Sequence, residues 1–569
     1  MSVKKKNISN NWQVNYFLAS ERQTFQNSKT LDEIDLPEFW FDLPPLEKII
    51  YQKSVNISEN KPFTYLHCDR LESPAEFIIN GERIHKHNGE EANFYLNISD
   101  YIKINQENGL QIKIQPSGLD GRIKGKVFLI FSDHKLSSQK LYSQEKAIEK
   151  PVWLKDTIIY ELYVRAFSEK GNLKSVIKKL DDLADLGVNC LWLMPIFPIG
   201  EQDRKGRLGS PYSIKDFKKI NSRYGSSRDL KKLVSQAHKR DMKIILDMVC
   251  NHAAWDNSLL EKHPAWFTKN NEGNIIQPPG TDWFDVADID YSNREVRDYM
   301  LDILIYWVKK YDIDGYRMDV AEYVPLDFWK HALKEIKKIK PEILFLAEGD
   351  HPKLHARAFH LSYGWNSRLS LLRILSYKQS ARAFKKVMQH EEKIYPAGAI
   401  KMRFSENHDL GRSCSIFGKE ESRVAAVLNF TVPGIPMIYA GQEIGARRRP
   451  SVFDKDIIEW ESADPEFYNF YQRLIKLRQE NKALQSGRME WIKNNYPAQI
   501  ISFARVYNDQ KIIILTNVTD RKIKVNLELQ ELFKNKDGIK FVLNDTEKYV
   551  FEKGRFEIGI EPFSYFIFI

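Results

Sequence analysis

The sequence has few cysteines, and they are far apart. Four occur in 569 residues, none of them in a C-x-x-C pattern: Cys68, Cys190, Cys250 and Cys414. This distribution argues against a disulfide framework or a zinc site, which show close or regular cysteine spacings. We therefore expect four free, buried thiols.

Long apolar runs are absent as well. No run approaches the ~20 residues of a membrane-spanning helix, and the N-terminus lacks the apolar segment of a signal peptide. We therefore expect no membrane span and a cytoplasmic location. The alternative is a periplasmic or secreted protein from which a signal was removed.

No part of the chain concentrates charge of one sign. Lys and Arg number 86 and Asp and Glu 76, a formal charge of +10, but the charges are interspersed and basic runs are short, such as Lys4–Lys6 and Arg447–Arg449. Nucleic-acid-binding proteins gather basic residues on one arm or face. We expect no nucleic-acid partner, and the choice between monomer and homodimer stays open.

The chain is too long for a single core, so we expect several domains. Residues 1–150 read as a β-sandwich. Phe77–Ile79 runs into Asn80-Gly81, the strongest short hairpin signal, and apolar residues alternate with polar ones from Leu110 to Ile114. The run FIINGERIHKHNGEEANFYLNISDYI resembles the jelly-roll sugar-binding domain of family 2 glycoside hydrolases. A packing module that binds no sugar is the alternative that we favour.

Residues 151–484 alternate between strand and helix. Seven strands are clear and an eighth, 361–365, is weaker; the clear ones are 157–164, 188–194, 243–249, 315–320, 343–347, 399–404 and 435–440. Helical spacing from Leu173 to Ala184 ends before Gly187, placed as a C-cap, and the helix 296–311 follows Ser292 and Glu295, spaced as a capping box. Eight parallel strands with helices outside predict a TIM barrel, with its active site at the carboxyl ends of the strands.

Two further segments depart from this alternation. Residues 253–290, after the third strand, are too long for a plain loop and predict a short excursion domain. Residues 485–569 return to β structure, with a hairpin turn at Asn508-Asp509 and a final strand-like SYFIFI. They predict a C-terminal β-sandwich.

Charged and polar residues follow four of the predicted strands. Asp247, Asn251 and His252 lie in DMVCNH, Arg317 and Asp319 in GYRMDV, Glu348 in LAEGD, and Asn407, His408 and Asp409 in FSENHD. In a strand, Arg317 and Asp319 point the same way, and we expect an ion pair that lowers the pKa of Asp319. Several carboxylates without a Cys/His cluster suit glycoside chemistry, in which one carboxylate attacks and one carboxylic acid protonates the leaving oxygen.

These four motifs resemble the signature regions of the α-amylase superfamily of glycoside hydrolases. GVNCLWLMP, GSPYSIKDF, VADID and GIPMIYAGQE agree with it, and the resemblance covers about residues 151–480. It implies Asp319 as nucleophile, Glu348 as general acid/base and Asp409 as transition-state stabiliser. It further implies that four residues bind the attacked sugar or orient the nucleophile: Tyr212, His252, Arg317 and His408.

The resemblance also raises the question of calcium. In calcium-dependent relatives, residues at the positions of Asn251 and Asp288 help to hold the ion, and both side chains are present here. The excursion is short, however, and Ca²⁺ takes six to eight oxygen ligands. We expect no required cofactor, with Ca²⁺ as the alternative.

The predicted function is therefore retaining hydrolysis of α-1,4-glucosidic bonds in starch, maltodextrins or related α-glucans. A glucan transferase or a branch- or cyclodextrin-cleaving enzyme of the neopullulanase type is the alternative, because a sugar hydroxyl can intercept the covalent intermediate. GYRMDVAEY also lacks the Lys-His pair that many endo-acting amylases carry after the nucleophile. A non-catalytic glucan-binding accessory protein is a third hypothesis, opposed by the presence of all three carboxylates.

Overall fold

The computed structural model describes residues 4–8, 12–18, 29–34, 46–68, 71, 73–87, 94–115, 123, 127–133, 135, 142–529, 540–543, 549–552 and 555–569. The chain divides into two compact units. One comprises Met1–Lys146 and Leu369–Ala397, and the other comprises Ala147–Arg368 and Gly398–Ile569. Within the described ranges, no helix is long and apolar enough to cross a membrane. The domain boundaries expected from the sequence stay predictions.

The first unit contains two antiparallel sheets that share one core. The strands are β1 (Lys4–Asn7), β2 (Trp12–Leu18), β3 (Lys29–Ile34), β4 (Leu46–Asn56), β5 (Phe63–Cys68), β6 (Ala75–Ile79), β7 (Glu82–His87), β8 (Phe94–Asn97), β9 (Glu107–Ile114) and β10 (Val127–Ser132). Their order is β1-β10-β5-β8 in one sheet and β3-β2-β4-β9-β6-β7 in the other. The predicted Asn80-Gly81 turn is confirmed, with φ of 52° and 85°. The buried face of β9 carries Leu110, Ile112 and Ile114, also as predicted. Part of the run that resembles a jelly roll, residues 88–93, lies outside the described residues.

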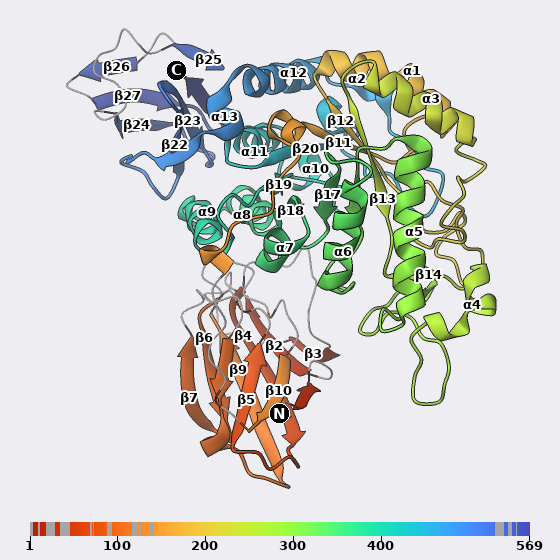
Figure 1. The fold of residues 1–569 in the computed structure, drawn as a ribbon. Coiled ribbons are helices and arrows are strands. Elements are labelled where there is room, and N and C mark those ends of the chain that lie inside the picture. The colour runs from red at the N-terminus through yellow and green to blue at the C-terminus, as the bar shows by residue number, and fades with distance from the viewer. Residues whose placement is uncertain are drawn as a thin grey trace. The chain divides into compact units, whose positions relative to one another are not determined.

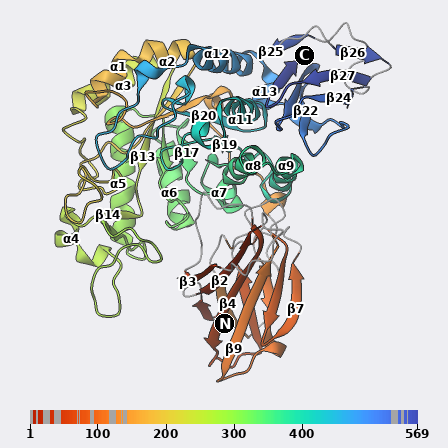
Figure 2. The ribbon, with the colours of Figure 1, turned by 180° about the vertical axis from the view of Figure 1, so that it is seen from behind.

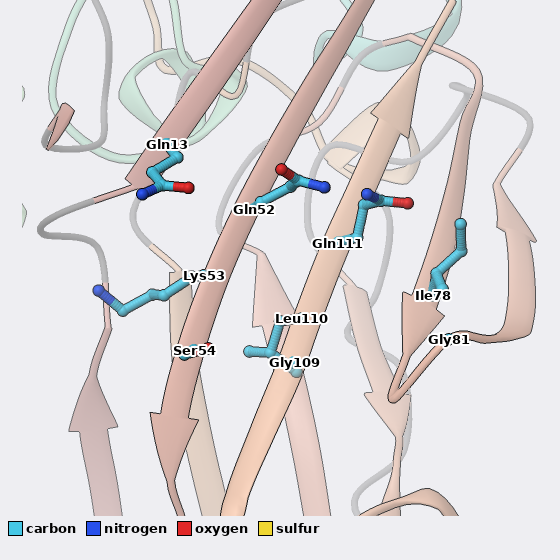
Figure 3. A pocket seen from close by; sticks show the side chains of 9 residues that line it. All are labelled: Gln13, Gln52, Lys53, Ser54, Ile78, Gly81, Gly109, Leu110 and Gln111. Carbon is cyan, nitrogen blue, oxygen red and sulfur yellow. The ribbon is translucent and has the colours of Figure 1, made fainter. Parts of the chain in front are cut away.

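The outer face of the six-stranded sheet has a hollow of about 650 Å³. Gln13, Gln52 and Gln111 occupy one register row across β2, β4 and β9, and Gly109 and Gly81 leave space beside them (Figure 3). The lining also includes Lys53 and Ile78, so it combines neutral polar, charged and apolar groups. Whether this unit binds a sugar stays a prediction.

The second unit is built on a closed barrel of eight parallel strands (Figure 1). They are β11 (Ile159–Leu162), β12 (Cys190–Leu193), β13 (Lys243–Met248), β16 (Gly315–Met318), β17 (Leu344–Ala347), β18 (Leu361–Tyr363), β19 (Lys401–Arg403) and β20 (Ile435–Tyr439). The TIM-barrel prediction is confirmed, including the weak strand candidate, which is β18. The four cysteines are free and buried.

Helices follow most of the barrel strands along the chain. They are α1 (Leu173–Lys178), α2 (Leu180–Leu186), α3 (Ser227–His238), α5 (Arg294–Tyr311), α6 (Leu326–Lys337), α7 (Pro352–Arg357), α8 (Trp365–Leu375), α9 (Arg382–Ile394), α10 (Ser413–Ile416), α11 (Lys419–Thr431), α12 (Pro465–Glu480) and α13 (Lys482–Ser486). Gly187 caps α2 in the left-handed region, with φ 97°, as predicted.

Two local helix predictions are wrong. The single helix expected from Leu173 to Ala184 is interrupted at Lys179, which has φ −100° and ψ 3°. The capping box expected at Ser292 is also absent, because Asn293 is the N-cap of α5 and its side chain accepts from the Glu295 amide. Asn is as good an N-cap as Ser, so the sequence is compatible with a helix that is capped by either of these adjacent residues.

Gly315 brings three barrel strands close together. A Cβ at this position would lie 2.6 Å from the Leu344 carbonyl oxygen and 2.9 Å from Ile245 Cγ2. Any larger residue would have to push β13 and β17 away from β16. These three strands end at the charged residues described below, so the missing side chain helps to hold those residues at short range.

The remaining elements lie outside the barrel. The excursion is a two-stranded ladder, β14 (His252–Ala254) with β15 (Val286–Asp288), and the short helix α4 (Ser258–Lys262). The C-terminal strands form two sheets, β21-β22-β23-β28-β25 and β24-β27-β26, around one core; Figure 2 shows them beside α11 and α13. Their bounds are β21 (Arg488–Trp491), β22 (Ile500–Tyr507), β23 (Gln510–Asn517), β24 (Ile523–Glu528), β25 (Phe541–Leu543), β26 (Tyr549–Glu552), β27 (Arg555–Ile560) and β28 (Tyr565–Phe568). The predicted hairpin at Asn508-Asp509 is confirmed between β22 and β23.

Candidate active site

The candidate site begins with three carboxylates at the carboxyl ends of three neighbouring strands. Asp247 is the last residue but one of β13, Asp319 follows β16 and Glu348 follows β17. The ladder continues past the strands, because the Asp319 amide donates to Met248 O and the Glu348 amide donates to Met318 O, both at 3.0 Å. The barrel therefore fixes the backbones of all three residues.

One guanidinium joins these carboxylates. Arg317 Nη1 lies 2.7 Å from Asp247 Oδ1 and 2.8 Å from Asp319 Oδ1, and Nη2 lies 2.8 Å from Glu348 Oε2. The contact of Nη2 is a charge contact without hydrogen-bond geometry. The predicted pairing of Arg317 with Asp319 is confirmed, and Arg317 holds two further carboxylates that do not lie on its own strand.

Aromatic rings shield this guanidinium from water. Its central carbon lies 5.2 Å from the Trp192 ring, 5.6 Å from the Tyr212 ring and 5.8 Å from the Tyr363 ring. The Arg317 side chain is 1% exposed. In such an environment charge interactions are stronger than in water, so the position of each carboxylate depends strongly on this one cation.

Three carboxylates surround a single guanidinium, and the pKa values of two of them, Asp319 and Asp247, are shifted. Burial raises the pKa of Asp319 well above its usual range; Arg317 opposes the shift, while the charges of Glu348 and Asp247 add to it. Burial likewise raises the pKa of Asp247, against the effect of Arg317. The expectation that Arg317 gives Asp319 a lowered pKa is therefore wrong in net direction, because burial outweighs the effect of Arg317, whose charge is also shared with two further carboxylates.

The two oxygens of Glu348 have different surroundings. Oε2 accepts a 2.8 Å hydrogen bond from the Val320 amide and faces Arg317. Val320 adopts φ 36°, a strained conformation for a β-branched residue, and it directly follows Asp319. Among the described residues no hydrogen bond reaches Oε1, so Oε1 is the oxygen that can carry a proton toward a ligand.

A second cluster adjoins the first through Tyr212. Its hydroxyl lies 3.2 Å from Asp247 Oδ2 and 2.6 Å from His408 Nε2, and His408 Nε2 is 3.1 Å from Asp409 Oδ2. The Asp409 side chain is 41% exposed. The Tyr212 and His408 rings stack with centroids 5.4 Å apart. The structure thus connects Tyr212, His408 and Asp409 to the carboxylates around Arg317.

His252 lies beside Tyr212 and is uncharged. Its side chain hydrogen-bonds to the Tyr212 backbone, and burial lowers its pKa to about 3. The Trp283 ring of the excursion is 5.4 Å from the His252 ring and 5.9 Å from Tyr323. His252 can therefore act as a neutral hydrogen-bonding group but cannot supply positive charge at neutral pH.

Sequence reasoning missed one charged residue of this region. Glu161 lies in β11, is fully buried, and its Oε1 is 2.5 Å from His408 Nδ1. The signal that could have found it is a glutamate within the apolar run IIYELYV. Seen alone, that glutamate gives no indication of its partner, which lies 247 residues away.

The two candidate calcium ligands each contact a neighbouring polar side chain. Asp288 Oδ2 accepts from Thr268 Oγ1 at 2.6 Å, and the Asn251 amide lies 3.4 Å from His252 Nδ1. Within the described ranges, no group of three or more His, Cys, Asp or Glu side chains is arranged to hold a metal. Ca²⁺ also takes amide and backbone carbonyl oxygens, so the calcium requirement stays a prediction.

Comparison with known proteins agrees with this geometry. Residues 155–466 match the family model described as "Alpha amylase, catalytic domain". Alpha-amylase 2 of Dictyoglomus thermophilum is 28% identical over 439 residues, covering 68% of this chain and 75% of that protein. The intracellular maltogenic amylase of Bacillus subtilis is 27% identical over 442 residues, covering 68% and 73%.

Solved structures give the same result. A maltogenic α-amylase from Thermotoga neapolitana matches with a TM-score of 0.68 and 33% identity, covering 73% of this chain and 98% of that chain. An α-amylase from Lactobacillus plantarum matches with a TM-score of 0.65 and 30% identity, covering 73% and 99%. The chain belongs to the α-amylase family and is a glycoside hydrolase of that family.

The shared guanidinium yields a stability prediction. Arg317→Met leaves the buried acids Asp247 and Asp319 without their cation, and removing one partner of a buried ion pair typically costs about 3–5 kcal/mol. We expect the unfolding temperature at about pH 7.5 to fall by roughly 5 °C or more. The loss should shrink at about pH 5, because acids whose folded pKa is raised destabilise the fold when ionised and cease to do so as they take up protons.

Differential scanning calorimetry at both pH values tests this. The matched control is Arg488→Met, which removes an arginine that is 71% exposed and paired with Glu490; exposed pairs contribute little. An equal loss for Arg317→Met at both pH values would show that packing, and not charge, accounts for its effect.

Proposed function

We propose that this protein hydrolyses α-1,4-glucosidic bonds with net retention, through a covalent glycosyl-enzyme. The observation that carries the proposal is the placement of Asp319 and Glu348. They occupy corresponding positions after adjacent parallel strands, whose backbones lie ~4.8 Å apart, and both face the guanidinium of Arg317. Two carboxyl groups about 5–5.5 Å apart leave no room for a water between nucleophile and sugar.

In this mechanism Asp319 attacks the anomeric carbon. Its Oδ1 is held by Arg317, so the other oxygen is free to form the bond. Glu348 protonates the leaving oxygen through Oε1, since Oε2 already accepts from Val320, and then removes a proton from the incoming water. Each step of attack inverts the anomeric centre, and two inversions restore the α configuration.

The second cluster binds the sugar that is attacked. Asp409, the most exposed of the three proposed catalytic carboxylates, holds sugar hydroxyls and stabilises the positive charge that develops on the ring. Tyr212 presents a flat apolar face to a sugar ring, while His252 and His408 offer hydrogen bonds. In these roles the three proposed catalytic carboxylates, the two histidines and Tyr212 act on one sugar unit.

The substrate that we propose is an α-glucan oligosaccharide or polysaccharide. Names of relatives support it: besides the two given above, a cyclomaltodextrinase of Thermoanaerobacter pseudethanolicus is 27% identical over 427 residues. Cleavage of cyclodextrins is the second candidate, supported by that name. A cytoplasmic location is likewise proposed, supported by the name of the intracellular amylase.

The stereochemistry of the product tests the mechanism. Proton NMR of maltotetraose hydrolysis, recorded before mutarotation, should show the α-anomer first. The matched control is Asp319→Asn, which keeps the shape of the carboxylate but cannot attack; its turnover should fall below about a hundredth of wild type. Initial release of the β-anomer would contradict the two-step mechanism.

A second prediction concerns calcium. Asp288 Oδ2 accepts from Thr268 and the Asn251 amide lies beside His252, and we propose that the enzyme requires no Ca²⁺. Treatment with EDTA should leave the unfolding temperature and the activity on maltodextrin unchanged. A large loss that Ca²⁺ restores, but Mg²⁺ does not, would show that a calcium site exists.

A further inference from the structure

Glu161 lies in the interior of the barrel, and His408 is its one ion-pair partner among the described residues. Oε1 accepts from His408 Nδ1, and Oε2 has no hydrogen-bond partner within the described residues. Burying an ionised carboxylate is unfavourable unless a partner compensates its charge. Neither the proposed attack nor the proposed protonation uses this residue, so its contribution must come through His408.

The hydrogen bonds around His408 determine where its protons lie. The Tyr212 hydroxyl has one proton and donates it to Asp247 Oδ2. The Tyr212 oxygen, 2.6 Å from His408 Nε2, can then only accept. Asp409 Oδ2 lies 3.1 Å from the same nitrogen, a charge contact without hydrogen-bond geometry. The contact with Tyr212 therefore requires a proton on Nε2, and the negative charge of Asp409 favours the protonated imidazole.

A second proton lies between Nδ1 of His408 and Glu161. If it belongs to His408, the pair is an imidazolium and a carboxylate; if it belongs to Glu161, both groups are neutral. The groups that face His408 are Glu161 on β11, Trp192 on β12, Tyr212, Asp409, Asp247 on β13 and Arg317 on β16. Three of these are carboxylates, which outnumber the single guanidinium.

The charges favour the imidazolium. Burial by itself lowers the pKa of His408, but the charges of Asp409 and Glu161, and the hydrogen bond to Glu161, raise it to about 9, with Arg317 opposing. Burial raises the pKa of Glu161, and His408 opposes that shift. Imidazole is intrinsically the stronger base of the two, so the shared proton lies on His408.

We propose that Glu161 is a positioning residue that keeps His408 doubly protonated, with its Nε2–H donated to Tyr212 and its positive charge beside Asp409. The result is a chain of hydrogen bonds with one direction: Glu161 accepts from His408, His408 donates to Tyr212, and Tyr212 donates to Asp247. This inference rests on the proposed function, in which Asp409 stabilises the developing charge and Tyr212 supports the sugar ring.

Without the charge of Glu161, this order is lost. A neutral His408 can place its only proton on Nδ1, and Nε2 then presents a lone pair to the Asp409 carboxylate. Tyr212 would turn its hydroxyl proton from Asp247 to Nε2. Both changes act on groups that touch the transition state, so turnover should suffer more than substrate binding.

The test is Glu161→Gln, which keeps size and an acceptor for Nδ1 but removes the charge. The substrate is α-maltosyl fluoride, whose leaving group needs no proton from Glu348. We expect kcat at about pH 8 to fall about tenfold, with KM changed less than kcat. The basic limb of the pH profile should move down by roughly one unit, because His408 loses its second proton at lower pH once a neighbouring negative charge is gone.

Two comparisons separate positioning from packing. Glu161→Asp and Glu161→Asn leave the same void and differ only in charge, so the first should keep the wild-type basic limb and the second should show the shift. In a His408→Gln background, Glu161→Gln should cost little more, because its effect passes through His408. An unmoved basic limb in both neutral variants, or costs that add in the double variant, would overturn the proposal.

These outcomes are independent of the product anomer. Inverting hydrolysis by the wild type would defeat the proposed function whatever the variants show. Retention with an unmoved basic limb would defeat only the role of Glu161.

Discussion

The arrangement of the active site depends on the guanidinium of Arg317. It contacts carboxylates from three neighbouring strands, at 2.7 to 2.8 Å, and is almost completely shielded from water. Arginine suits this task because its planar fork offers several donors at fixed angles and stays charged when buried. A lysine would present one point charge and could not face three acids in this geometry.

The fold supplies what this interaction needs. Gly315 lets β13, β16 and β17 approach closely, and the strained backbone of Val320 turns its amide toward Glu348. Strain of this kind persists where the surroundings fix the conformation. Here those surroundings are the continued strand ladder and the arginine, so the same contacts that hold the acids in place also hold the strained residue.

The excess of acids over cations has a chemical use. A site with more carboxylates than positive groups favours the positive charge that develops on a sugar ring. Burial raises the pKa of Asp319 and Asp247, and neighbouring carboxylates add to the shift. The proposed imidazolium of His408 moderates this excess next to Asp409. Glu161 would thus set the charge state of His408, although the two residues lie far apart in the sequence.

Much of this architecture could be predicted from the sequence, because the signals are local. The strand-helix alternation, the Asn80-Gly81 turn and the αL cap at Gly187 each reside in a few adjacent residues. The charged motifs after the strands were also visible, and the barrel brings them together. The start of α5 was misplaced by one residue, since Ser292 and Asn293 are both good caps.

Other features depend on contacts that the sequence does not display. In the sequence, Glu161 is an isolated charged residue in an apolar strand, and its partner His408 lies 247 residues further along the chain. The raised pKa of Asp319 follows from burial, with the charges of Glu348 and Asp247 adding to it, and only the assembled barrel reveals these causes. The sequence supplied the pair Arg317 and Asp319, but the sign of the pKa shift came from burial and from neighbours on other strands.

The central claim, that Asp319 is the attacking group, can be tested most directly by trapping the intermediate. A ring-fluorinated maltosyl fluoride forms glycosyl-enzymes that hydrolyse slowly, and Glu348→Gln should slow their hydrolysis further by removing the base. After digestion, mass spectrometry should find the added sugar on the peptide that contains Asp319, on that residue. An adduct on a different carboxylate, or product release with no adduct under these conditions, would contradict the account.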